Sequence, residues 1–406
     1  MIQWSRYPMF LHIAWSEFRA IATSYPVLLV LVGGVFAYGL LYNYMYAPNV
    51  VREVPIAVVD HSHTALSRRY ARLLDATPDV SVVYHAQDMV EAKRLMLRAE
   101  VYGILYLPRD FEGRMLRGEL SVCPFYATTD AFLYYEAMER ANLEVMEAMD
   151  GEYRTQLLGD LSLGGLAAVA TQSPVTVVGT ALYNPIEGYG VYLIPSVLMI
   201  IIFQTLMMLV AMMSNHKSEH ALLVSCAQMQ VGRTRLALSI VCGKTITYAM
   251  LYAIFAFFLV GLLPLIFDIP HTASWGAMAV LLIPYILGTG FLGLALSRWY
   301  ADAETPILLI AFFSIGLIFL SGVSYPLELI PWFWRVVHYI IPAAPAVLAY
   351  VQLNSMEATL HGVWPQLLAL WGQVVVYFVL AVWVYRGKLF CIKETLTTLP
   401  RARSRR

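Results

Sequence analysis

Six long runs of apolar residues dominate the pattern along the chain. A helix needs roughly 20 apolar residues to cross a hydrocarbon core of about 30 Å, where it satisfies its own backbone polar groups. The pattern therefore predicts an α-helical polytopic membrane protein. The six expected transmembrane helices occupy residues 26–46, 189–213, 236–263, 275–297, 306–324 and 366–385.

The segment 47–187, between the first two runs, has a different pattern. Short β-rich runs alternate with helical periodicity, which is typical of an α/β domain with a mixed or parallel sheet. A long return helix from about 131 to 170 would bring the chain back to the membrane. We predict one inserted α/β domain on the periplasmic side. Its expected strands are 54–60, 80–84, 102–107 and 120–127, and its expected helices are 64–75, 88–99 and 111–116.

Residues 1–25 carry apolar side chains at helical spacing, among them Phe10, Ile13 and Phe18. This spacing predicts an amphipathic helix in the cytoplasmic membrane interface, with an ordinary buried helix as the alternative. The first long run resembles an uncleaved anchor more than a secretion signal, because it is long and lacks small residues at a plausible cleavage point.

Composition and charge support the membrane prediction and add an orientation. The chain is 59% hydrophobic and 13% charged with zero formal net charge, so nothing suggests a nucleic-acid partner. With both termini in the cytoplasm, the outer loops 264–274 and 325–365 contain a single Lys or Arg residue, Arg335, as the positive-inside rule requires. We therefore expect a multi-pass protein of the inner membrane with a basic cytoplasmic tail at 387–406. The cytoplasmic segments would hold Arg6, Arg19, Lys217, Arg233, Arg235, Arg298, Arg386, Lys388, Lys393, Arg401, Arg403, Arg405 and Arg406.

Few residues suggest catalysis, a cofactor or a metal. Gly243-Lys244-Thr245 imitates the end of a phosphate-binding loop but lies inside an apolar run. His61-Ser62-His63 lacks a third ligand, which favours a solvated turn. The cysteines have no metal-ligand spacing, and Cys123 is alone in the inserted domain. We predict no catalytic, cofactor-binding or metal site.

The expected spans carry almost no ionisable residues. Lys244 is the exception, and we expect it to snorkel from the cytoplasmic end of the third span. Glu187, Asp302 and Glu304 lie at span ends. Ion-driven carriers usually keep acidic groups in mid-membrane, so the energy for any transport is expected to come from another protein.

Two connecting segments have their own patterns. In the loop 214–235, Ser218 is expected to cap a short helix, with Glu219 in its first turn. The outer segment 325–365 is unusually apolar for a loop and is interrupted by prolines. Its tryptophans suit the headgroup level, so we predict a re-entrant segment that dips into the outer leaflet.

Several local matches, in this order and on this topology, resemble the permease subunits of ABC-2-type exporters, of the multidrug or lipid type with a large periplasmic domain. Asn354-Ser355-Met356 is similar to the version found in Bacteroidetes. The chain departs from the family at 215–221, where relatives carry an Arg/Glu-rich stretch followed by Gly-Thr. The matching segments are Val54 to Asp60, Tyr102 to Phe111, Tyr183-Asn184-Pro185, and Ser321-Gly322 with Pro326, Pro331, Trp332 and Pro342.

The resemblance implies partners. The loop 214–235 would be a coupling helix seated in a groove of a separate ABC ATPase subunit, and a plain connecting loop is the alternative. Two permeases, as a homodimer or with a paralogue, would enclose a pathway through the lipid bilayer. A periplasmic adaptor protein would join the inserted domain to an outer-membrane channel. The expected ATPase contacts are Lys217, Glu219, Leu223, Val224 and Gln228.

The resemblance further implies export of a hydrophobic or amphipathic substrate, such as a drug, a lipid or a cell-envelope component. We expect the second and fifth spans to line the pathway, because Gln204, Thr205 and Ser314 are rare polar residues there. Five methionines would make a pliable wall, or simply pack between helices: Met199, Met207, Met208, Met212 and Met213. The candidate lining residues are Phe203, Gln204, Met207, Phe312 and Ser314.

Two other classes of protein compete with the exporter. A membrane-anchored periplasmic sensor or scaffold would need a cytoplasmic signalling domain, and the tail after Arg386 is too short for one. An intramembrane hydrolase or acyltransferase would need a nucleophile and a base within the spans, and no histidine lies there. The pattern favours the exporter.

Overall fold

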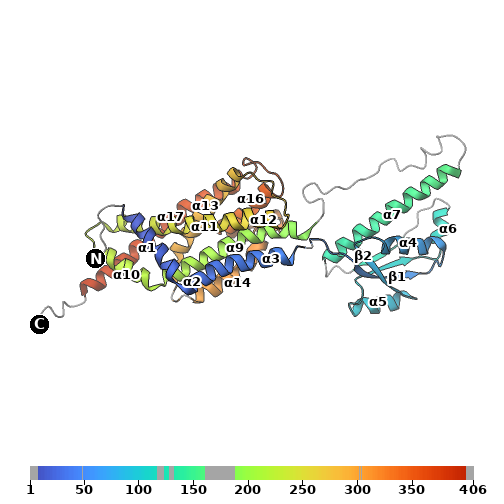
Figure 1. Ribbon diagram of the computed structural model, residues 1–406, viewed down its shortest axis with the longest axis horizontal. Helices are drawn as coiled ribbons and strands as arrows, with labels where there is room; N and C mark the ends of the chain where they lie inside the picture. The colour runs from blue at the N-terminus through green and yellow to red at the C-terminus, as the bar shows by residue number, and fades with distance from the viewer. Residues whose placement is uncertain are drawn as a thin grey trace. The chain divides into compact units, whose positions relative to one another are not determined.

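The computed structural model describes residues 8–47, 49–116, 123–127, 132–160, 188–300, 302 and 304–398. The chain divides into two compact units. The helical unit comprises Met1–Ala47 and Gly190–Arg406, and the inserted unit comprises Pro48–Tyr189 (Figure 1). Glu187, Tyr183-Asn184-Pro185, the end of the return helix and the arginines from Arg401 onward lie outside the described residues.

The inserted unit contains a four-stranded sheet of order β2-β1-β3-β4. The central strand β1 pairs in parallel with β2 and β3, and β4 runs antiparallel to β3. The fourth strand is shorter than the expected 120–127, and 117–122 lie outside the described residues. The strands are β1 (Val54–Asp60), β2 (Val80–His85), β3 (Gly103–Leu107) and β4 (Phe125–Ala127).

The alternation of side chains along β1 explains how helices cover both faces of this sheet. Val54, Ile56 and Val58 join one core with α4 (Ala65–Asp75) and α7 (Phe132–Asp160). Ala57 and Val59 point to the opposite face and join a second core with α5 (Met89–Leu97). A short helix, α6 (Phe111–Leu116), follows β3.

The helical unit contains five helical segments that are long and apolar enough to cross a membrane, or six if a bent pair counts as one span. The span expected at 306–324 is the 17-residue helix α14 (Glu304–Leu320), about 26 Å long. The five segments are α2, η1 and α3 (Tyr25–Leu28, Leu29–Gly33 and Gly34–Met45), α9 (Tyr189–Ser214), α11, η2 and α12 (Arg233–Ala256, Phe257–Leu262 and Leu263–Ile266), α13 (Trp275–Leu296) and α17 (Trp364–Thr398).

Helix α9 of this unit is buried along most of its length. Helices α11, α13 and α17 pack against one another and run side by side in Figure 1. The Tyr285 hydroxyl on α13 donates to the Met199 carbonyl on α9 at 2.6 Å. Met199 and Met213 are fully buried, so both pack between helices.

A bent helix pair, α15 (Trp332–Ile340) and α16 (Ala343–Asn354), turns through 86°. The last carbonyls of α15 have no partner within that helix. Gln373 of α17 donates to the Tyr339 carbonyl at 2.7 Å, and the Tyr377 hydroxyl donates to the Ile340 carbonyl. These bonds let the chain break its helix among apolar side chains. That the segment dips into a leaflet stays a prediction.

The turn after α14 depends on a glycine. Gly322 has a φ of +86°, in the left-handed region that residues with a side chain rarely adopt. The preceding carbonyl of Leu320, at the end of α14, accepts a hydrogen bond from Nδ1 of buried His338 at 2.8 Å. The chain then passes through a short 3-10 turn, η3 (Leu327–Leu329), into α15.

Candidate functional site

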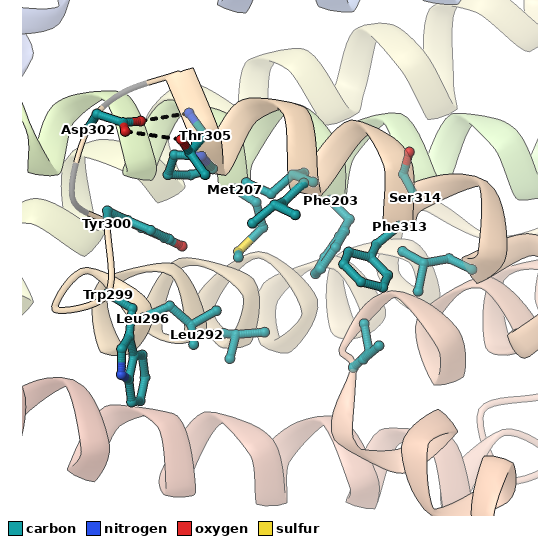
Figure 2. A pocket seen from close by; sticks show the side chains of 15 residues that line it. Phe203, Met207, Leu292, Leu296, Trp299, Tyr300, Asp302, Thr305, Phe313 and Ser314 are labelled. Carbon is teal, nitrogen blue, oxygen red and sulfur yellow. Dashed lines mark hydrogen bonds between the residues drawn. The ribbon is translucent and has the colours of Figure 1, made fainter.

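An apolar cavity of about 400 Å³ separates α14 from α9 and α13. Figure 2 shows the Phe313 ring beside the Phe203 ring, while the Ser314 hydroxyl points the other way. That hydroxyl donates to the Ala311 carbonyl at 2.7 Å, so its polar atom is used within α14. The lining residues are Phe203, Met207, Leu292, Leu296, Trp299, Tyr300, Asp302, Thr305, Pro306, Leu309, Ile310, Phe313, Ser314, Leu317 and Ile341.

A second apolar cavity, of about 780 Å³, adjoins the first and shares Phe313, Leu317 and Ile341 with it. It lies between the second half of α14 and the bent pair. We call the two cavities together the α14 groove. The second cavity is lined by Phe313, Gly316, Leu317, Phe319, Leu320, Ser324, Tyr325, Ile330, Trp334, Val337 and Ile341.

Hydrogen bonds join α9 to the chain near each end of α14. Between these two bonds, the groove separates the two helices. The Asn215 amide, just after α9, donates to the Asp302 carbonyl at 2.6 Å. The Tyr192 hydroxyl, in the first turns of α9, donates to the Val323 carbonyl. The close packing of α14 itself is with α15 and α16. The groove is therefore a gap between helices whose ends are fixed.

Polar groups gather at the Asp302 end of the groove. The Asp302 carboxylate accepts from the Thr305 backbone N–H at 2.7 Å and from its hydroxyl at 3.0 Å (Figure 2). These two bonds lower the pKa of the Asp302 carboxyl, which therefore stays ionised at neutral pH. The buried Tyr300 hydroxyl has no hydrogen-bond partner among the residues that the structure describes. One end of the groove thus offers a negative charge and an unused hydroxyl.

The structure brings together three of the five expected pathway residues. Phe203, Met207 and Ser314 line the first cavity, whereas Gln204 lines neither cavity. Phe312 is 73% exposed on the open side of α14. Phe313, which the sequence analysis missed, lines both cavities. Apolar residues lie three and four positions from Phe312 as well as from Phe313, so helical spacing does not single out Phe313.

The short helix α10 (Lys217–Ala227) has one exposed and one buried face. Its N-cap is His216, whose Nδ1 accepts from the Ser218 N–H at 3.3 Å, so the expected cap at Ser218 is wrong by two residues. Five side chains divide between the faces. Lys217 and Gln228 are exposed and Val224 is half-buried, whereas Glu219 and Leu223 are buried.

Lys244 does not snorkel, which corrects the expectation from the sequence. Its side chain is fully buried, with Nζ 2.8 Å from Glu17 Oε1 and 2.7 Å from Glu219 Oε2. Glu17 belongs to α1 (Met9–Thr23) and Glu219 to α10. A lysine that finds two carboxylates inside the protein has no need to reach the headgroups.

The helix α1 packs closely along α11. A Cβ on Gly243 would lie 2.6 Å from the Phe10 carbonyl oxygen, so the glycine permits this approach. The Thr247 hydroxyl adds a hydrogen bond to the Ala14 carbonyl at 2.8 Å. Trp15 on the other side of α1 is 60% exposed. The helix α1 therefore has one buried and one exposed face, and the location of the exposed face in the membrane interface stays a prediction.

Comparison with known protein families matches residues 18–383 to the family described as ABC-2 family transporter protein. The chain belongs to the ABC-2 transporter family. No curated protein matches it. As an ABC-2 permease it is the multi-pass membrane component of a transporter rather than the ATPase, and its family implies an ABC ATPase as partner. The α14 groove and α10 are the two features of this permease to which we assign functions below.

Proposed function

We propose that this ABC-2 permease exports a hydrophobic or amphipathic molecule, such as a drug, a lipid or a cell-envelope component, at the expense of ATP hydrolysed by a separate subunit. The α14 groove is the observation that carries this proposal. Most of its lining is apolar, and the one charged residue among the lining residues is Asp302 at one end. Such a lining suits a molecule with an apolar body and a polar or cationic end.

A second permease copy, identical or a paralogue, completes the pathway in this proposal. The open side of α14 exposes large apolar side chains, with Leu308, Phe312 and Phe319 each more than half exposed. A large exposed apolar face marks lipid or a partner helix. Two such faces opposite each other would close the groove on its open side. The bundle would then count six spans, with α14 as the fifth.

The ATPase is proposed to seat on the exposed face of α10. Lys217, Ala221, Val224 and Gln228 follow one another at helical spacing on that face. Glu219 and Leu223, also expected as contacts, are buried within the permease and are left out of the revised contact set. When the ATPase displaces such a short helix, the spans on either side of it can tilt with it as a rigid body.

The orientation follows from the same assignment. With α10 and both termini in the cytoplasm of an inner-membrane protein, the inserted unit lies in the periplasm. There it would meet an adaptor protein that leads to an outer-membrane channel. The unit's own sheet and two cores give it a rigid body for such a contact.

Co-purification tests the ATPase assignment. Tagged permease extracted in mild detergent is expected to retain an ATPase that carries a phosphate-binding loop. Ala221→Trp would place a large side chain at the centre of the proposed contact face and is expected to lower the yield of that ATPase at least tenfold. Leu97→Trp, at an 87% exposed position of the inserted unit, is the matched surface control. Equal ATPase yields from the two variants would contradict the assignment.

Transport in vesicles tests the groove. Met207→Trp fills part of the first cavity and is expected to reduce ATP-driven export of an amphipathic dye several-fold, with ATPase binding unchanged. Met250→Trp, on an exposed side of α11, is the control. A complex that binds the ATPase but exports no amphipathic dye would remove this cargo class. A permease that binds a periplasmic protein and no ATPase would instead favour the sensor or scaffold.

A further inference from the structure

Three charged side chains from three different helices meet inside the helical unit, and we call them with two tyrosines the charge cluster. Lys244 of α11 lies 2.8 Å from Glu17 of α1 and 2.7 Å from Glu219 of α10. Each of the three residues is less than 5% exposed. One lysine therefore connects α1 with α10.

Each carboxylate receives a tyrosine hydroxyl as well as the lysine. Tyr248 of α11 donates to Glu17 Oε1 at 2.5 Å, and Tyr385 of α17 donates to Glu219 Oε1 at 2.9 Å. Lys388, one turn further along α17, lies 4.0 Å from Glu219 Oε1. The two negative charges are thus matched by two positive charges, and four helices contribute to one buried network.

Stability alone is a weak account of such a network. A buried ion pair gains little over apolar side chains of the same shape, because its charges must first leave water. Such a pair instead fixes the relative arrangement of the helices that carry it, since its groups stay paired in one geometry only. The packing of the helices also indicates that the cluster links separate elements. Helix α10 packs mainly against α17, whereas α1 packs against α11. The ion pair between Glu219 and Lys244 connects these two packed pairs.

We propose that Lys244 is a positioning residue that makes α1 and α10 move as one body with the start of the third span. This inference rests on the proposed function, in which an ATPase displaces α10. The displacement reaches α1 and α11 through Glu219, Lys244 and Glu17 rather than through the connecting loop. Because α1 is also amphipathic, the same movement would carry its exposed Trp15 face along the membrane surface.

Distance measurements test this directly on the intact ATPase–permease complex in nanodiscs. Spin labels at Trp15→Cys on α1 and His220→Cys on α10 report the separation of the two helices, and His220 is exposed and is not one of the proposed ATPase contacts. A second pair, His220→Cys with Val280→Cys on α13, reports movement of α10 against the bundle. On trapping the complex with ATP and vanadate, we expect the second distance to change and the first to stay constant. A changed first distance, or two constant distances, overturns the inference.

Neutral variants test whether the charges themselves carry the link. Glu17→Gln/Lys244→Met/Glu219→Gln removes all three buried charges, and the charge that remains in the network is Lys388, whose side chain is 18% exposed. The permease is therefore expected to fold and to bind the ATPase. We expect its basal ATP hydrolysis to persist while stimulation by an amphipathic substrate falls at least tenfold. Undiminished stimulation overturns the inference. If the triple variant fails to fold, the two spin-label distances measured with the native cluster still test the inference.

The failure of the inference is separate from the failure of the proposed function. An unmodified complex that shows no substrate-stimulated hydrolysis contradicts the exporter itself. Normal stimulation in the unmodified complex, with independent movement of α1 and α10, contradicts only the role of Lys244. Lys388→Met, which removes the outlying charge of the network, is the matched control and is expected to change stimulation less than twofold.

Discussion

The charge cluster and the α14 groove hold their helices in opposite ways. In the cluster, Lys244 is buried and paired with two carboxylates, and directional hydrogen bonds from Lys244, Tyr248 and Tyr385 hold those carboxylates. In the groove, α14 is fixed by hydrogen bonds near its ends and faces α9 across an apolar gap. The comparison teaches that directional contacts lie where helices must keep one arrangement. Non-directional apolar surface lies where the occupant can vary.

The largest effect is expected from breaking the cluster at its centre. Lys244→Met leaves two buried carboxylates without their counter-ion, which costs about 3–5 kcal/mol when a buried pair loses one partner. We expect a clear fall in the thermal unfolding temperature of the detergent-solubilised permease. The neutral triple variant should recover most of it. A Lys244→Met variant as stable as the unmodified protein would show that water reaches this site.

The next effect comes from separating α1 from α11 without touching a charge. Gly243→Ala introduces a Cβ 2.6 Å from the Phe10 carbonyl oxygen and 2.9 Å from Ile13 Cβ, and overpacking of this kind costs about 1–3 kcal/mol. We expect a lower unfolding temperature and faster proteolysis at α1. Gly276→Ala on α13 meets nothing within 4 Å and is the matched control. Equal behaviour of the two variants would show that α1 does not need this close approach.

A smaller effect is expected at the bent pair beside the groove. Gln373→Leu removes the donor to the Tyr339 carbonyl and leaves that group unsatisfied, at a cost of about 1–3 kcal/mol. The unfolding temperature of the purified permease measures this loss. Val375→Leu, at an exposed position of the same helix, should have no effect. If Gln373→Leu were neutral, water would have to reach the break between α15 and α16.

The smallest effect is expected where α14 is tied to α9. Tyr192→Phe removes only the hydroxyl that donates to the Val323 carbonyl, worth about 1 kcal/mol. We expect nearly unchanged stability but faster hydrogen exchange in α14, since its end is released. Tyr325→Phe, in the wall of the second cavity, is the control. Unchanged exchange in Tyr192→Phe would mean that packing against α15 and α16 alone fixes α14.

The spans could be predicted from the sequence because a run of apolar residues is a local property. The strands 54–60, 80–84 and 102–107 were likewise visible from β-rich runs between helices and correspond to β1, β2 and β3. The fifth span was predicted to end at residue 324, but α14 ends at Leu320, since the apolar run continues into the turn that Gly322 makes. Hydropathy cannot distinguish the end of a helix from an apolar turn.

The charge cluster could not be predicted, because Lys244 and Glu17 lie 227 residues apart and their pairing depends on how α1 packs. The same limit applies to α10. Its pattern indicates a helix with two faces, but Glu219 is a charged residue on the buried one. In α14 both sides are apolar, so periodicity alone did not separate Phe312 from Phe313.

Helix α17 donates hydrogen bonds to other helices near each end of the bundle. Gln373 and Tyr377 hold the broken end of α15, and Tyr385 holds Glu219 in the cluster. No proline interrupts the roughly 18 Å of helix between Gln373 and Tyr385. Such a segment behaves as a stiff strut. A tilt of α17 at its Tyr385 end would therefore move α15, which lines the groove, without any other element between them.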